Sequence, residues 1–456
     1  MAASEPLCAR IDLAAADGRV RLDELRGRLV SQGDLVSPAG RRKTIEVFGE
    51  PLSPREVVER ICGDVRGQGL SALLDYTRRI DGADLTADTL FVPGVALDAA
   101  HAAVEPEFLA AVRRIRDRVE TFQRALLARD VELRLAGGGV LRHRHLPLGR
   151  VGVCVPGGAA AYPSTLLMTV VPAQVAGVRE IVVMAPPTGF GAENRHVLAT
   201  CRELGVTTVL RAGGAQGVAA LAYGVDGLPR VDKIVGPGNL FVALAKEHVY
   251  GDVSIDAIAG PSEIVIVADD AGRPDTIAAD MLAQAEHSPG SAILLTASRP
   301  LADAVAASLG RQVTVLERGD LTRDSLRRFA AIVVTRSDEE SAALAEELAP
   351  EHLAIDTRDP EATLGRIRHC GAAFLGPWSP VAAGDYAAGP SHVLPTGGTA
   401  RFAAGLSAND FLRSGSVIAL TRADLAAMAD DIRILADTEG LTAHRRSVQA
   451  RRQSDS

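Results

Sequence analysis

The sequence predicts a mixed α/β protein built on parallel sheets, and its second half carries that prediction. From residue 150 onward, short apolar runs recur, each followed by a loop that contains glycine or proline. Helical segments such as 192–204 and 215–224 separate most of these runs. Strands that are apolar on both faces and alternate with helices are typical of parallel sheets covered on both sides. Eight such runs are many for one small sheet, so we expect two similar α/β layers.

The first predicted elements are helices, over residues 51 to about 135. Ser53 is a plausible N-cap, with Pro54 at the first helical position and Glu56 at the third. The helical periodicity continues through 101–130, and the AGGG at 136–139 ends it. We therefore expect a helical region in front of the sheets.

The strands and helices of the sheets follow. Residues 276–287 contain no glycine or proline and are predicted to form a helix, with Gln284 and His287 on one face. Residues 420–452 are also predicted helical, and they are too few to build a core, so they must dock on the body or on another subunit. The predicted strands are 151–155, 180–185, 207–212, 233–236, 263–269, 292–297, 331–335 and 372–376.

Composition excludes several classes of protein. The 456 residues suffice for two or three domains, and the net charge of −8 argues against a nucleic-acid partner. No stretch approaches the ~20 apolar residues of a membrane span. Five cysteines without a CxxC motif argue against a disulfide framework or a thiolate zinc site. The N-terminus has early acidic residues and lacks the apolar core of a signal peptide. We therefore expect a cytoplasmic protein.

Four of the ten histidines have polar neighbours that could share in chemistry. A site formed by Gln284, His287, Asp385 and one more imidazole would offer nitrogen and oxygen but no sulfur, which suits zinc or another divalent metal. Each motif also has an ordinary interpretation, as a solvated helix face, a loop ion pair or a structural loop. The four histidines and their neighbours are His287 after Gln284 and Glu286, His352 beside Glu351, His392 after Asp385, and His444 after Glu439.

Glycine-rich loops are the second candidate. VCVPGGAAAYPS (153–164), LRAGGAQG (210–217) and VGPGN (235–239) each follow a predicted strand, where an open α/β sheet places its ligand crevice. None contains the GxGxxG fingerprint of standard dinucleotide sites. They are tight turns that could contact phosphate or ribose.

Seven ordered motifs, spread from about residue 50 to 450, resemble the histidinol dehydrogenase family. They are GVCVPGGAAAYPSTLLMTVVPAQVAGV, VDKIVGPGNLFVALAK, DAIAGPSEIVIVAD, AQAEHSPGSAILLT, APEHLAI, GDYAAGPSHVLPTGGTARFAAGLSANDF and TEGLTAH. The resemblance implies oxidation of L-histidinol through L-histidinaldehyde to L-histidine, the last two steps of histidine biosynthesis, with two NAD consumed and one zinc per site. It also implies two related Rossmann-like parallel-sheet domains with a helical N-terminal region.

The resemblance assigns roles to residues of this chain. His352 is expected to be the general base, and Glu351 to activate water on the aldehyde. A homodimer with shared active sites is implied, because the C-terminal tail is exchanged and brings Glu439 and His444 to the partner's site. The zinc ligands would be Gln284, His287, Asp385 and His444; the other substrate contacts Ser164, Ser262, His392 and Glu439; and the NAD contacts Cys154, Gln216 and Asn239.

The resemblance also implies domain boundaries: an N-terminal arm at 1–45, a larger discontinuous domain at 46–153 and 264–406, a smaller NAD-side domain at 154–263, and the exchange tail at 407–456. Three positions depart from the family's pattern. Cys154 replaces a Tyr and cannot supply its hydroxyl or ring, which questions NAD affinity. Ala354 and Ser391 replace Glu and Asn and could signal a changed substrate.

Three alternatives stay open on the sequence. A relative could oxidise another small polar alcohol, such as a sulfonated diol, although a sulfonate needs added Arg or Lys donors and the motifs show no extra basic residue. A catalytically silent metal-binding homologue would be expected to lose a metal or acid–base position, and every one of these keeps a residue of the required type. A metallohydrolase would leave the nicotinamide loops unexplained.

Overall fold

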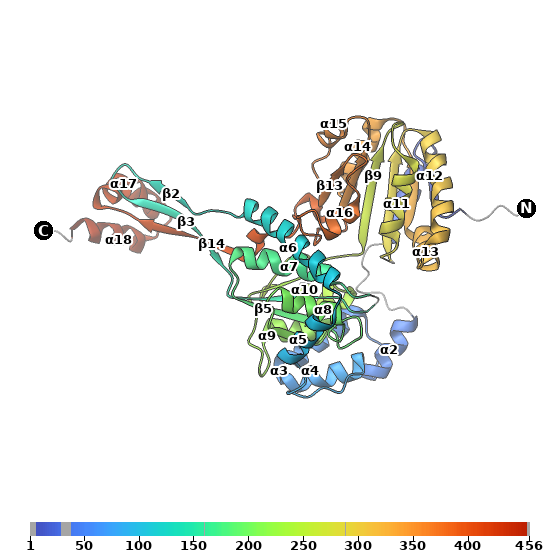
Figure 1. Cartoon of the computed structure of the whole chain (residues 1–456). Helices are drawn as coiled ribbons and strands as arrows, with labels where there is room; N and C mark the ends of the chain where they lie inside the picture. The colour runs from blue at the N-terminus through green and yellow to red at the C-terminus, as the bar shows by residue number, and fades with distance from the viewer. Residues whose placement is uncertain (1–5, 29–37, 159, 288, 454–456) are drawn as a thin grey trace, which may run out of the picture.

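Two parallel sheets organise the chain (Figure 1). The computed structural model describes residues 6–28, 38–158, 160–287 and 289–453. The six-stranded sheet has the order β1-β11-β10-β9-β12-β13 and the five-stranded sheet the order β6-β5-β4-β7-β8. The strands are Ala9–Asp12 (β1), Arg150–Cys154 (β4), Glu180–Ala185 (β5), Thr208–Arg211 (β6), Lys233–Val235 (β7), Ser254–Ile255 (β8), Ser262–Ala268 (β9), Gly290–Thr296 (β10), Ala330–Val334 (β11), His352–Asp356 (β12) and Ala372–Leu375 (β13).

The two sheets have the same strand order around their central strand. In the five-stranded sheet β4 lies in the middle, with β5 and β6 on one side and β7 and β8 on the other. The six-stranded sheet repeats this order with β9 in the middle, β10 and β11 on one side and β12 and β13 on the other, and adds β1 beyond β11. All neighbouring strands are parallel. This order is typical of doubly wound folds, and it confirms the prediction of two similar layers. Each of the eight predicted strands corresponds to an observed strand.

Helices cover the sheets. The capping box predicted at Ser53 is present, because the Ser53 hydroxyl accepts the backbone N–H of Glu56 and the Glu56 carboxylate accepts that of Ser53. The helices that come before β6 in the chain are Gly18–Gly27 (α1), Pro38–Phe48 (α2), Pro54–Gln68 (α3), Leu70–Tyr76 (α4), the π-helix Thr77–Asp81 (η1), Gly94–Ala103 (α5), Pro106–Leu126 (α6), Pro163–Ala176 (α7) and Arg195–Glu203 (α8).

The remaining helices alternate with strands as the sequence predicts. The helix expected at 276–287 runs from Pro274 to Ala285, so His287 follows its end rather than lying within it. The helices are Gly214–Tyr223 (α9), Leu240–Val249 (α10), Pro274–Ala285 (α11), Arg299–Gln312 (α12), Gly319–Phe329 (α13), Asp338–Leu348 (α14), Pro360–Leu364 (α15) and Val381–Tyr386 (α16), with short 3-10 turns at Val313–Val315, Thr399–Arg401 and Ala408–Phe411.

A separate lobe, which we call the tail lobe, projects from the body (Figure 1). It joins the strands Val131–Arg134 (β2), Val140–Pro147 (β3) and Leu412–Ala419 (β14) to the helices Arg422–Thr438 (α17) and Thr442–Gln453 (α18). The helical prediction to about residue 135 is wrong at its end, because β2 pairs with β3 across the glycine turn. The carboxylate of Asp424 accepts the N–H groups of Gly137 and Gly139 and fixes that turn to α17.

The packing divides the chain differently from the expected boundaries. Helices α3 and α4 pack with α9, α10 and the five-stranded sheet in one core, and α5 and α6 pack on the other face of that sheet. Strand β1 of the expected N-terminal arm pairs instead with β11 of the six-stranded sheet. Residues 1–5 and 29–37 of that arm lie outside the described residues. We propose that 54–126 belong with the five-stranded sheet, because these helices bury its two faces.

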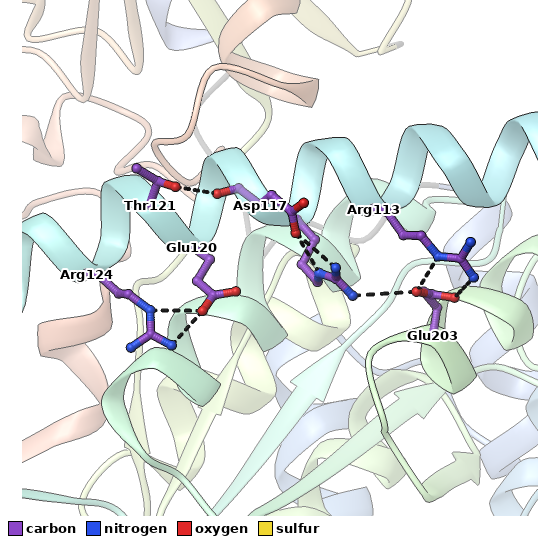
Figure 2. A network of polar contacts seen from close by, with 7 residues as sticks. Arg113, Asp117, Glu120, Thr121, Arg124 and Glu203 are labelled. Carbon is purple, nitrogen blue, oxygen red and sulfur yellow. Dashed lines mark hydrogen bonds and ion pairs between the residues drawn. The ribbon is translucent and has the colours of Figure 1, made fainter.

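Glu203, the last residue of α8, ties α8 to α6 and α5 of this core, and Figure 2 shows its contacts with α6. Its carboxylate accepts two hydrogen bonds of 2.8 Å from the Arg113 guanidinium, and His101 Nε2 lies 2.8 Å away. The side chain of Glu203 is only 9% exposed. The hydrogen bond from Arg113 dominates over burial and lowers the pKa of Glu203 to about 2.

Replacing Glu203 by Gln is expected to lower the free energy of unfolding by about 1–2 kcal/mol at pH 7. Because the folded pKa of Glu203 lies below its unfolded value near 4.5, this loss should be present above that pH and fade as the pH falls towards 2. Urea unfolding at pH 7 and pH 3 measures it. Glu120→Gln is the matched control, since Glu120 forms only an exposed pair with Arg124 on α6 and should cost a few tenths of a kcal/mol. Equal losses in the two variants would contradict the prediction.

Among the described residues, no helix combines the length and the apolar character that crossing a membrane requires.

Candidate functional site

A cavity of about 740 Å³ lies between the two sheets. The strands of the five-stranded sheet approach it with their carboxyl ends, at Cys154 and at the turn after Val235. The six-stranded sheet approaches it with its amino ends, where Ser262 begins β9 and His352 begins β12. The two sheets therefore border the same cavity with opposite edges. The loops of the five-stranded sheet lie opposite the side chains of the six-stranded sheet.

The three glycine-rich loops line one end of the cavity, as the sequence predicts. Gly157, Gln216 and Asn239 are on its wall. Asn239 caps α10 by accepting the N–H of Val242 at 3.1 Å. A Cβ on Gly236, whose φ is +102°, would meet the carbonyl oxygen of Cys154 at 2.4 Å, so only glycine lets the two loops approach. The loops thus form a wall that packs tightly against the ends of the strands.

Cys154 is buried at the last position of β4, with 1% of its surface exposed. Burial raises the pKa of its thiol to about 12, so the side chain is a neutral apolar group at the cavity wall. Ser391 and Ala354 are buried, and they are not among the described residues that line the cavity. The Ser391 hydroxyl donates instead to the carbonyl of Met168 at 2.8 Å. Two of the three departures from the family pattern therefore lie behind the wall.

Glu351 is at the centre of a hydrogen-bonded cluster at the other end. Its Oε2 accepts the hydroxyl of Ser262 at 2.7 Å and the backbone N–H of Glu263 at 2.9 Å. The amide of Gln284 donates to the Ser262 hydroxyl oxygen at 2.5 Å. Burial raises the pKa of Glu351 to about 7, so the carboxyl group can gain or lose a proton near neutrality.

His352 is almost fully buried beside Glu351. Its Nδ1 lies 3.1 Å from the carbonyl oxygen of Glu263, which fixes the ring. Its Nε2 lies 3.5 Å from Oδ1 of Asp385 and has no hydrogen-bond partner within the part of the chain that the structure describes. Burial opposes the imidazolium, but the carboxylates of Glu351 and Asp385 outweigh it and raise the pKa of His352 to about 9.

Two further imidazoles face Asp385, which lies on α16. His392 Nδ1 is 2.9 Å from the backbone carbonyl of Asp385. Burial lowers the pKa of His287 and that of His392, so both rings favour the neutral form that ligates metals. Burial alone would raise the pKa of Asp385, but the neighbouring histidines, His352 first among them, lower it. The carboxylate is therefore ionised among three imidazoles.

The structure brings together most of the predicted site residues. Gln284 is buried just behind the wall, on the Ser262 hydroxyl. Glu439 and His444 are exposed in the tail lobe and do not line the cavity. Across the described residues, no three His, Cys, Asp or Glu side chains form a metal-sized group. The predicted residues that line the cavity are Cys154, Ser164, Gln216, Asn239, Ser262, His287, Glu351, His352, Asp385 and His392.

Two residues of the cavity and its hydrogen-bonded cluster were not predicted from the sequence. Glu263 holds Glu351 through its backbone N–H and His352 through its carbonyl, which no sequence signal reveals. Asp81 lines the opposite end of the cavity and accepts a hydrogen bond from Gln216. It ends a π-helix, and neither its spacing nor its neighbours mark it in the sequence.

The charge of the cavity is informative about its ligand. Among the described lining residues, Glu351 and Asp385 are the carboxylates at the end where three imidazoles gather. The described wall contains no arginine, and its one lysine, Lys43, acts on Asp81 at the other end. Such a site favours a cationic or metal-bound amine over an anionic sulfonate.

Comparisons with known proteins agree over nearly the whole chain. The family model of histidinol dehydrogenase matches residues 51–452. The histidinol dehydrogenase of Rhodopirellula baltica is 58% identical over 440 residues, which are 96% of each chain. That of Geobacillus kaustophilus is 47% identical over 411 residues, covering 90% of this chain and 96% of the relative. The crystal structure of histidinol dehydrogenase from Elizabethkingia anophelis has a TM-score of 0.87 at 29% identity and covers 99% of both chains. With a family match across 51–452 and relatives this similar, the chain belongs to the histidinol dehydrogenase family.

Proposed function

We propose that the protein oxidises L-histidinol through L-histidinaldehyde to L-histidine, with two NAD reduced per turnover. The observation that carries the proposal is that one cavity is lined both by the Glu351–His352 pair and by the glycine-rich loops. An alcohol loses a hydride and a hydroxyl proton to become an aldehyde. The hydrated aldehyde loses a second hydride and proton to become an acid. Both oxidations need a base and an adjacent hydride acceptor, and the cavity has room for both.

His352 is proposed as the base of both oxidations. Its Nδ1 is held by the Glu263 carbonyl, which leaves Nε2 for proton transfer. A base must be neutral, whereas Glu351 and Asp385 favour the imidazolium. A cation on Asp385 would weaken that effect and return the pKa of His352 towards neutrality. The buried and unpartnered Nε2 thus supports both a substrate hydroxyl in front of the ring and a metal on Asp385.

Glu351 is proposed to activate water in the second oxidation. Its pKa near 7 suits a group that takes a proton from water and releases it again. The hydrogen bonds from Ser262 and Glu263 occupy Oε2, so its carboxylate is oriented before substrate binds. Ser262 in turn is held by Gln284.

Glu351→Gln is expected to lower the rate of aldehyde conversion by about 100-fold or more, and the rate of aldehyde formation by less than tenfold. The amide can accept the Ser262 and Glu263 hydrogen bonds but cannot take a proton from water. Trapping the aldehyde with a hydrazine while NADH is counted separates the two steps. Equal losses in both steps would contradict the division of labour between Glu351 and His352.

Zinc fits the donors that the chain supplies. Gln284, His287 and Asp385 offer amide oxygen, imidazole nitrogen and carboxylate oxygen, a set that suits zinc. We propose His444 of a second copy as the fourth ligand. Zinc would hold the amino and imidazole nitrogens of histidinol as a positioning ion. Ser164 and His392 on the wall, and Glu439 of the second copy, are proposed to contact the substrate.

NAD is proposed to lie against the glycine-rich loops and accept the hydrides. Gln216 and Asn239 are on that wall, and Oε1 of the Gln216 amide has no hydrogen-bond partner among the described residues. Cys154 is proposed to contribute the backbone at the end of β4, since its side chain is buried and neutral. Gly157 and Gly213 pack closely on Pro186, since a Cβ on either would lie within 3 Å of that ring, and this packing fixes the two loops at the wall.

A homodimer with exchanged tail lobes is part of the proposal. Apolar side chains of the tail lobe are exposed, among them Ile418 at 69% and Leu435 at 62%. Glu439 and His444 do not line the cavity of their own chain. A second copy would cover the apolar side chains and receive both residues at its own site. We place the reaction in the cytoplasm, which suits the five free cysteines of the chain.

The test is NADH formation from L-histidinol by purified, zinc-loaded protein, with the product identified by mass. Two NADH per histidine are expected. No turnover by a folded dimer with bound zinc would overturn the proposed substrate and point to another small polar alcohol. Among the described residues that line the cavity there is no Arg, and Lys43 is the one Lys, which speaks against a sulfonated diol.

A further inference from the structure

Asp81 has a position that the proposed chemistry does not use. It is the last residue of the π-helix η1, and it lines the cavity beside Gln216 of the glycine-rich wall. One of its oxygens, Oδ2, accepts a hydrogen bond of 3.0 Å from Nε2 of Gln216. The two residues are 135 positions apart in the sequence, so the tertiary fold alone brings them together.

Gln216 is held in one orientation. Its side chain is 1% exposed, and its amide must turn Nε2 towards Asp81, because two oxygens facing each other would repel. Its Oε1 then lies over Gly214, where a Cβ would be 2.7 Å away and where φ is +56°. Glycine at this position leaves the space for that oxygen. Oε1 is buried and has no hydrogen-bond partner within the described parts of the chain.

A buried amide oxygen without a partner costs stability, typically about 1–3 kcal/mol, unless a ligand supplies the donor. Asp81 adds a second cost. Burial raises its pKa to about 6, against the hydrogen bond from Gln216 and the charge of Lys43, which act in the opposite direction. The fold therefore tolerates an ionised, poorly solvated carboxylate at this place. Groups that are unfavourable for folding and lie on a ligand cavity are typical of binding sites.

We propose that Asp81 is a positioning residue for the dinucleotide: its carboxylate fixes the Gln216 amide so that Oε1 accepts a hydrogen bond from NAD. The chemical class of the donor is a hydroxyl of a ribose or the carboxamide N–H of the nicotinamide. This inference rests on the proposed function for the identity of the ligand. It adds that the cofactor contact of Gln216 depends on a carboxylate from a different part of the fold.

The test is direct calorimetric titration of the protein with NAD, without histidinol. Asp81→Ala is expected to raise the Kd for NAD about tenfold, the effect of losing one hydrogen bond to a charged group. Asp81→Asn retains an acceptor oxygen and should raise Kd about two- to fourfold. In steady-state assays the KM for NAD should follow Kd, whereas kcat and the KM for histidinol should change less than twofold. Asp84→Asn is the control, since Asp84 is exposed three residues away and does not line the cavity.

Two further readouts separate positioning from a structural role. Because the folded pKa of Asp81 lies above its unfolded value near 3.8, its charge disfavours the folded state above about pH 6. Asp81→Asn should therefore have a Tm at pH 8 equal to or above that of the wild type. The charged side chain that acts on Asp81 is Lys43, and its charge lowers the pKa of Asp81 less than burial raises it. In a Gln216→Ala background, Asp81→Ala should have no further effect on Kd.

An unchanged Kd in folded Asp81→Ala, or effects of Asp81→Ala and Gln216→Ala that simply add, would overturn the proposal. A lower Tm for Asp81→Asn together with weaker binding would also overturn it, in favour of a structural role. These outcomes differ from a failure of the proposed function. Wild-type protein that binds NAD but leaves histidinol unreacted would contradict the substrate and not the role of Asp81.

Discussion

His352→Asn is expected to lower kcat for both oxidation steps by about 10³- to 10⁴-fold, near the upper range for loss of a general base. The Asn amide can still donate to the Glu263 carbonyl, which Nδ1 of the ring now contacts at 3.1 Å. It has no counterpart of Nε2, the atom that is buried and unpartnered in the described structure. The fold should therefore survive while the base is lost. Because the same imidazole is proposed to be the base in both hydride transfers, the aldehyde should be oxidised as slowly as the alcohol is.

Rates measured separately from histidinol and from histidinaldehyde test this prediction. Zinc content and Tm, determined on the same samples, establish that site and fold are intact. His196→Asn is the matched control: His196 lies on α8, pairs with Glu105 at the surface and should leave kcat unchanged. A loss below tenfold in His352→Asn with zinc bound would remove His352 from the role of base.

The layers of the fold are predictable from sequence because their signal is local. Each buried strand is a short apolar run between turns, and the loops 153–164, 210–217 and 235–239 contain the glycines that tight strand-to-helix turns require. Parallel strands then place those loops at one edge of the sheet. This reasoning correctly places the three loops together on one wall of the cavity.

The side of the cavity proposed to be catalytic follows a different rule. Ser262 and His352 stand at the amino ends of β9 and β12, the edge opposite to the one where an open sheet normally binds its ligand. In the sequence, APEHLAI resembles a loop as much as a strand. It becomes β12 because β9 and β13 pair with it from both sides, and β13 lies some twenty residues further on. Pairing between distant segments leaves no local signal.

The tail lobe was unpredictable for a related reason. β3 has the sequence VLRHRHLP, which lacks an apolar face, and it becomes a strand because all eight of its residues pair with β14. The two segments are about 270 residues apart. The sequence did indicate that residues 420–452 could not build a core alone. It could not indicate that their base is a polar antiparallel sheet, which holds the lobe away from the body (Figure 1).

Because of that separation, mixing His444→Ala protomers with His352→Ala protomers is expected to restore about one quarter of wild-type activity, although each variant alone should be inactive. In an exchanged dimer, the body of the His444→Ala protomer receives His444 from its partner, and one complete site forms. The second site has neither residue. Random reassortment makes about half of the dimers mixed, and each mixed dimer has one active site of two. A dimer purified through two different affinity tags should therefore reach about half of the wild-type rate.

If each site were complete within one chain, neither mixture would be active, because every chain would lack one essential imidazole. Proven mixed dimers without activity would thus show that His444 acts in its own subunit, and the tail lobe would then have to fold back onto the cavity that it does not reach here.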